Sequence, residues 1–229
     1  MKNDLPQPLA RAARRPPFAR SLLAKCRRAY DKARVSLGGQ KRELVVYRVE
    51  HARDGLEDAK EQFQATLEQF SAISHFQGGG LEEKYRRLNR ELEQSQAIAK
   101  AVRDRIHLIE EVAQALFEEW ESELEHYSSR SLRSSSRQKL KSTRQHYQRL
   151  IKAMRRAEAR IHPVLTAFKD QVLFLKHNLN ARAIASLHHE MVAVGLDIAA
   201  LITAMERSIF EANAFVNSLS DQKALPGRS

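Results

Sequence analysis

Between residues 81 and 127, apolar side chains recur at alternating steps of three and four residues for more than six heptads. This spacing places one apolar stripe along a helix, and a stripe sustained over so many heptads is typical of a coiled coil. We therefore expect one long helix here, with Trp120 and Tyr127 in the core. The stripe consists of Leu81, Tyr85, Leu88, Leu92, Ser95, Ala99, Val102, Ile106, Ile109, Ala113, Leu116, Trp120, Leu124 and Tyr127.

Three more stripes with helical spacing predict three more helices. The third helix is expected to begin at about Ser134 and to be kinked at Pro163, because the apolar phase is the same on both sides of this proline. The first of the three stripes is Val45, Val49, Ala52, Leu56, Ala59, Phe63, Leu67, Phe70 and Ile73. The next is Leu140, Tyr147, Met154, Ile161, Phe168 and Leu175, with Thr143, Leu150, Ala157 and Val164 at the companion position. The last is Leu187, Met191, Val194, Ile198, Leu201, Met205, Ser208, Ala212, Phe215 and Leu219.

The stripes are separated by helix breaks near Gly78–Gly80, Ser128–Ser136 and Asn178–Asn180. The predicted fold is all-α: an elongated antiparallel four-helix bundle or coiled coil, in which the second and third helices project beyond the outer two. The alternative is a long, straight two-armed antiparallel helical hairpin. Whether the third and fourth helices are separate or one bent helix is left open. Three consecutive glycines favour the bundle. We divide the chain into an arm over residues 1–41, a single helical domain over 42–220 and a polar tail over 221–229.

The net charge of +11 is distributed unevenly along the chain. Residues 1–42 carry a net +10, residues 43–129 a net −9 and residues 130–160 a net +10. Antiparallel pairing of the second and third helices would place acidic side chains beside the basic stretch Arg133–Arg160, and we expect these charges to define the register of the pair. The acidic side chains are Glu110, Glu111, Glu118, Glu119, Glu121, Glu123 and Glu125.

The arm has no comparable acidic partner, and four prolines prevent a continuous helix in it. It is either largely disordered or carries one short helix near residues 21–37. Its cations are candidates for contact with phosphate, on an anionic membrane surface or on nucleic acid; the alternative is an arm without a specific partner. The candidate anion-contact residues are Arg11, Arg14, Arg15, Arg20, Lys25, Arg27 and Arg28.

No group of residues in the sequence resembles an active site, so we expect neither enzymatic activity nor a cofactor. The tightest cluster of titratable residues is His188, His189 and Glu190, but adjacent residues of a helix point in different directions and are poorly placed to share a metal ion. The single cysteine, Cys26, excludes an intramolecular disulfide. No uninterrupted apolar run approaches the ~20 residues that span a bilayer.

Three segments, LEDAKEQFQATLEQFSAI (56–73), ALFEEWESELEHYSSRSLR (115–133) and DQVLFLKHNLNARAIASL (170–187), resemble an uncharacterised bacterial helical family, the domain of unknown function 2959. The resemblance implies a helical domain without an assigned activity and, in many members, an N-terminal lipoprotein signal. Cys26 occupies the place of a lipobox cysteine here. Lys25 departs from that motif, and no apolar region precedes it.

Two hypotheses for the function follow. The first is a non-enzymatic helical scaffold or interaction protein at the cell envelope, with an unknown protein partner or a second copy of the chain. The second is a nucleic-acid-binding accessory protein that uses the basic arm, together with the positive flank that the Arg133–Arg160 stretch leaves beside the glutamates. The absence of a signal peptide favours the cytoplasm, whereas the lipoproteins of the family favour the periplasm or envelope.

Overall fold

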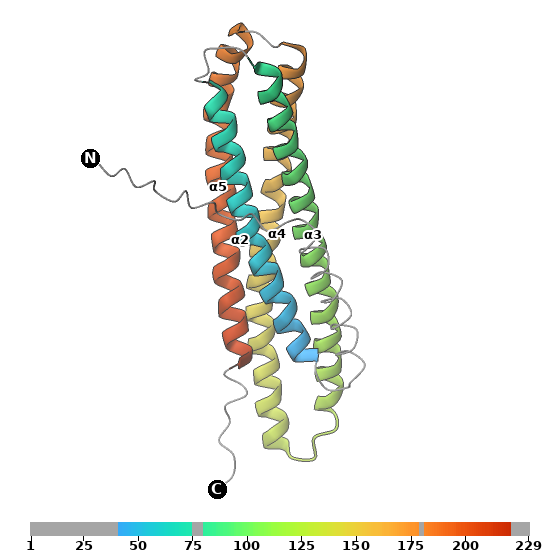
Figure 1. The fold of residues 1–229 in the computed structure, drawn as a ribbon. Helices are drawn as coiled ribbons and strands as arrows, with labels where there is room; N and C mark the ends of the chain where they lie inside the picture. The colour runs from blue at the N-terminus through green and yellow to red at the C-terminus, as the bar shows by residue number, and fades with distance from the viewer. Residues whose placement is uncertain (1–40, 75–79, 179–180, 221–229) are drawn as a thin grey trace, which may run out of the picture. The chain divides into compact units, whose positions relative to one another are not determined.

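The computed structural model describes residues 41–74, 80–178 and 181–220, which form four α-helices: α2 (Lys41–Ser74), α3 (Leu81–Leu124), α4 (Arg130–His177) and α5 (Ala181–Ser220). Within these ranges, the side chains of residues 73, 74, 81, 181–189, 191 and 220 are not described. Each helix packs against two others, in the order α2–α3–α4–α5 and back to α2 (Figure 1). Consecutive helices run in opposite directions, so the predicted all-α, up-down-up-down bundle is confirmed.

The hairpin alternative is wrong, because α2 lies beside α3 rather than continuing it. Gly80, the residue before α3, has a φ of 96°, the left-handed conformation that glycine adopts without steric cost. At the other end, α3 and α4 extend beyond the start of α2 and the end of α5 (Figure 1). α4 and α5 are separate helices, and α4 continues through Pro163.

The predicted break over Ser128–Ser136 is too long. α4 begins at Arg130, so most of the serine-rich run is helical, and only residues 125–129 separate α3 from α4. The reason is a cap: the Ser129 side chain accepts a hydrogen bond of 3.3 Å from the backbone N–H of Leu132. A serine at this position satisfies a backbone donor that the helix itself leaves free.

The predicted stripes form the core. All described stripe residues are buried except Leu67, Tyr85, Ala99, Tyr127 and Tyr147, which are partly buried. Phe70 of α2 and Phe168 of α4 stack across the bundle with their ring centroids 4.7 Å apart. The heptad spacing thus predicted correctly which side of each helix is buried.

A second group of buried side chains lies towards the end of the bundle at which α3 and α4 project. It contains Ala113, Phe117, Trp120, Leu124 and Leu140, with Tyr127 and Tyr147 packed against it. The indole Nε1 of Trp120 donates a hydrogen bond of 2.9 Å to the Ser136 hydroxyl. We call this group the tip cluster.

One polar contact joins α2 and α3 inside the core. The hydroxyls of Thr66 and Ser95 are both fully buried and lie 3.1 Å apart. Thr66 also donates a hydrogen bond of 2.8 Å to the Gln62 carbonyl of its own helix. Because a buried hydroxyl without a partner is costly, this pair favours one register of α2 against α3.

Candidate functional site

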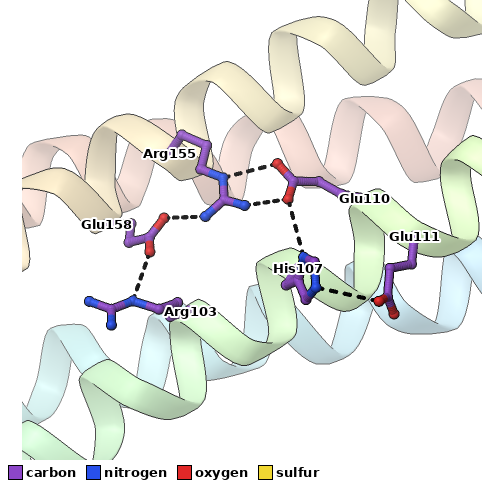
Figure 2. Close-up of polar contacts among 6 residues, drawn as sticks. All are labelled: Arg103, His107, Glu110, Glu111, Arg155 and Glu158. Atoms are coloured by element: carbon purple, nitrogen blue, oxygen red, sulfur yellow. Dashed lines mark hydrogen bonds and ion pairs between the residues drawn. The ribbon is translucent and has the colours of Figure 1, made fainter.

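The most extensive polar contacts of the described residues lie between α3 and α4 (Figure 2). The guanidinium of Arg155 donates to both carboxylate oxygens of Glu110, from Nε at 2.9 Å and from Nη2. Its Nη1 donates to Glu158 at 2.6 Å, and Glu158 also accepts from Nε of Arg103 at 3.1 Å. His107 extends this series of contacts: its Nδ1 lies 3.8 Å from Glu110 and its Nε2 lies 3.4 Å from Glu111. Acids and bases therefore alternate across the two helices.

The positions of these residues along each helix explain why they meet. Arg103 and Glu110 are seven residues apart and face the same side of α3, while Arg155 and Glu158 are three apart on α4. The bidentate geometry between Arg155 and Glu110 is the strongest form of this ion pair. The hydrogen bond to Glu110 raises the pKa of Arg155 above its ordinary value, so the cation persists at any physiological pH.

A second link lies three helical turns away. Arg144 donates a hydrogen bond to Glu121, which lowers the pKa of the Glu121 carboxyl and raises that of Arg144. Of the seven glutamates predicted to face the basic stretch, Glu110 and Glu121 pair with α4. Glu119 instead lies 3.3 Å from Lys41 of α2, and Glu111 contacts His107 of its own helix. The charge pairing between α3 and α4 is thus narrower than predicted, because the other glutamates do not face α4.

The outer side of α4 carries cations that these pairs leave free. Residues 126–157 contain no Asp or Glu at all. Five basic residues on this side are exposed and form no ion pair within the described part of the chain: Arg137, Lys141, Lys152, Arg156 and Arg160. Their spacing places them along the side of α4 opposite its core, over roughly 35 Å. We call these five residues the α4 basic row.

The phenol of Tyr147, at the edge of the tip cluster, is an unusually weak acid because it is partly buried. Burial, and to a smaller extent the charge of Glu110, raises the pKa of Tyr147 from 10.0 to about 12. Since the folded protein holds this proton more tightly than the unfolded chain, the resulting stabilisation is complete below pH 10 and is lost as the pH rises towards 12.

We therefore expect the thermal midpoint of the wild-type protein to fall more steeply between pH 10 and 12 than that of Tyr147→Phe. Thermal melts at several pH values, followed by circular dichroism, measure both slopes. Tyr85→Phe, which removes a hydroxyl elsewhere in the bundle, is the matched control and should follow the wild type. Identical slopes for the wild type and Tyr147→Phe would contradict the expectation.

The residues that the sequence singled out for function fall mostly outside the described residues. This holds for the seven candidate anion-contact residues of the arm and for Cys26. The side chains of His188 and His189 are likewise not described, and Glu190 is exposed. Within the described residues, no group of three or more His, Cys, Asp or Glu side chains could hold a metal ion. No helix in the same part of the chain is long and apolar enough to cross a membrane.

The α4 basic row belongs to the Arg133–Arg160 stretch, which the sequence offered as a positive flank for an anion, but the extent of the row was not predicted. The available signal was the 32-residue stretch without an acid, 126–157, together with the outward position of its cations on the helix. The exposed apolar side chains of α5, on the side of the helix opposite the predicted stripe, were not predicted.

Comparison with protein families agrees with the resemblance of the three segments. The family model described as "Protein of unknown function (DUF2959)" matches residues 30–219, which is most of the chain. The chain belongs to this family. The matched range contains all of α2, α3 and α4 and all but the last residue of α5, so the four-helix bundle is the domain that the family model describes. No curated protein and no solved structure gives a significant match.

Proposed function

We propose that this protein is a non-enzymatic helical scaffold or interaction protein that acts at the cell envelope. The observation that carries the proposal is the separation of charge on the bundle surface: the α4 basic row lies beside an α3 whose exposed side chains include Glu111, Glu118 and Glu123. Such a polarised surface steers and orients a charged partner. The envelope is suggested by the resemblance to a family with many lipoproteins, although Cys26 follows a lysine and no apolar region precedes it.

The second candidate is a nucleic-acid-binding accessory protein, and the α4 basic row is the observation that favours it. A line of exposed cations without neighbouring acids can follow a phosphate backbone, and each neutralised phosphate releases counterions. The arm carries further cations in its own sequence. Phosphate is the shared chemistry, so duplex DNA and anionic vesicles have to be compared directly.

The test uses the full chain and two sets of Gln substitutions. The arm variant replaces Arg11, Arg14, Arg15, Arg20, Lys25, Arg27 and Arg28, and the row variant replaces Arg137, Lys141, Arg156 and Arg160. We expect the full chain to bind anionic vesicles, and we expect the arm variant to lose more of this binding than the row variant. The binding should also weaken steeply as salt is added, because the screening length shortens from ~10 Å at 0.1 M.

The matched control replaces four exposed cations elsewhere, Arg87, Arg90, Lys100 and Lys169, so that it has the same net charge as the row variant. It should bind more strongly than the row variant. Tighter binding to duplex DNA than to vesicles would select the second candidate. Binding that neither the arm variant nor the row variant weakens would contradict both.

A further inference from the structure

Helix α5 is apolar on two opposite sides. One side carries the buried stripe that includes Val194, Ile198 and Leu201. The other carries Val192, Leu196 and Phe210, whose exposed fractions of 65%, 69% and 61% are the three largest among the exposed large hydrophobic side chains described. Ala199 and Thr203 lie between them and are also exposed. We call these five residues the outer row of α5.

The spacing of the outer row is that of a second coiled-coil seam. Its steps of four, three, four and seven residues keep one line along the helix, and the step of seven passes over Glu206, an exposed carboxylate that lies 4.0 Å from Lys60 of α2. The row covers roughly 27 Å, and its middle positions, Ala199 and Thr203, are small enough for another helix to approach closely. A helix that is apolar all round is normally buried, and an apolar patch of this kind on a surface normally marks a contact.

The flanks of α5 carry opposite charges. On one side, α2 is held to α5 by the hydrogen bond of 3.0 Å from Arg53 to Asn213, and it exposes Asp54, Glu61 and Glu68. On the other side, Arg149 of α4 lies 3.8 Å from Glu211 of α5, and Arg156 and Arg160 follow on the same helix, both exposed. The outer row is therefore bordered by an acidic flank and a basic flank.

This arrangement is complementary to itself in one orientation only. A two-fold axis parallel to α5 places the acidic flank of one copy opposite the basic flank of the other. An axis perpendicular to α5 would instead place acid opposite acid and base opposite base. In coiled coils, charges that flank the apolar seam select the partner and its orientation in the same way.

We propose that two copies of this chain associate side by side and in parallel through the outer row of α5. Each apolar side chain of the row then meets its own counterpart, Leu196 on Leu196 and Phe210 on Phe210. The inference rests on the proposed role as an interaction protein, for which it names the partner and the contact surface. It requires neither vesicle nor nucleic-acid binding.

Analytical ultracentrifugation of the full chain over a range of micromolar concentrations tests the association. The wild type should show a monomer–dimer equilibrium, and Leu196→Glu with Phe210→Glu should weaken it at least about 100-fold, because four apolar side chains per dimer lose their contacts. Leu132→Glu is the matched control: Leu132 is 59% exposed but lies at the start of α4. All three proteins should keep the same helix content, since the replaced side chains are exposed.

Cysteine cross-linking tests the orientation, in a Cys26→Ser background that removes the native thiol. Leu196→Cys alone should form a disulfide-linked dimer, because a parallel pair brings this position next to itself. In an antiparallel pair centred on Thr203, position 196 would lie beside position 210. A mixture of the single variants Leu196→Cys and Phe210→Cys would then form only the mixed dimer.

Three results would overturn the proposal: a wild type that is monomeric at every concentration, a dimer that survives the double glutamate variant, or a mixed dimer only. A monomeric wild type whose vesicle binding is lost in the double glutamate variant would show that lipid covers the outer row. The dimer measurements contain no vesicle or DNA. A failure to dimerise therefore does not change the expected result of the vesicle and DNA titrations, and a failure of those titrations does not change the expected dimer.

Discussion

Phe168→Ala should lower the free energy of unfolding by about 3–5 kcal/mol, among the largest losses expected from one substitution in this protein. Phe168 is fully buried in the main core and stacks on Phe70, with ring planes only 4° apart. The smaller side chain leaves a cavity lined by rigid helices, which cannot collapse without moving α2 towards α4. Chemical denaturation followed by circular dichroism measures the change.

The matched control for this prediction is Leu173→Ala, five residues further along α4. Leu173 is also a large apolar side chain, but it is 44% exposed, so its loss should cost much less, about 0.5 kcal/mol. Comparable losses at the two positions would mean that the core does not depend on the stacked ring pair.

Trp120→Ala should cost about 3–5 kcal/mol in the tip cluster, and its effect should be local. The indole is buried, donates its N–H to Ser136, and lies below the guanidinium of Arg42, which is 4.9 Å from the ring centroid. Since the buried side chains of the tip cluster form a group apart from the main core, to which only the partly buried Tyr147 among the described residues of the group links them, the end of α3 and the start of α4 should open before the rest of the bundle.

Hydrogen exchange resolves this effect by position. In Trp120→Ala, amide protection should fall over residues 113–140 and stay nearly unchanged around Phe168. Ser136→Ala, which removes only the partner of the indole N–H, should cost about 1 kcal/mol. A uniform loss of protection along all four helices would show that the tip and the main core unfold as one unit.

The burial pattern was predictable because a heptad pattern sustained over several turns places its apolar residues on the same side of the helix. Ile106 and Ile109 therefore took their predicted places, and so did Ser208, although it is polar. The start of α4 was not predictable in the same way, because serine is compatible with a helix, a cap or a loop. The single hydrogen bond from Leu132 to Ser129 decided between them.

The charged contacts were less predictable than the core. Glu110 and Glu111 are neighbours in the sequence, yet one binds Arg155 of α4 and the other contacts His107 of its own helix. The difference depends on how far α3 is rotated about its own axis relative to α4. The apolar stripe fixes this rotation only approximately, so it does not show which of two neighbouring side chains points at α4. The outer row of α5 also has heptad spacing, but it is shorter than the predicted stripe of the same helix, and only the longer stripe was assigned to the core.

The closed order of helix packing has a consequence for how the chain reaches its native state. Three of the four helix contacts, α2–α3, α3–α4 and α4–α5, join helices that follow one another directly along the chain. Such hairpins close short loops and form at little entropic cost. Only the pairing of α2 with α5 joins distant segments, so we expect it to form last and to complete the core in a single late step.

The start of α2 and the end of α5 lie at one end of the bundle (Figure 1). A chain opened at residues 125–129, with Ser220 linked to Lys41, should therefore fold to the same bundle in a different order.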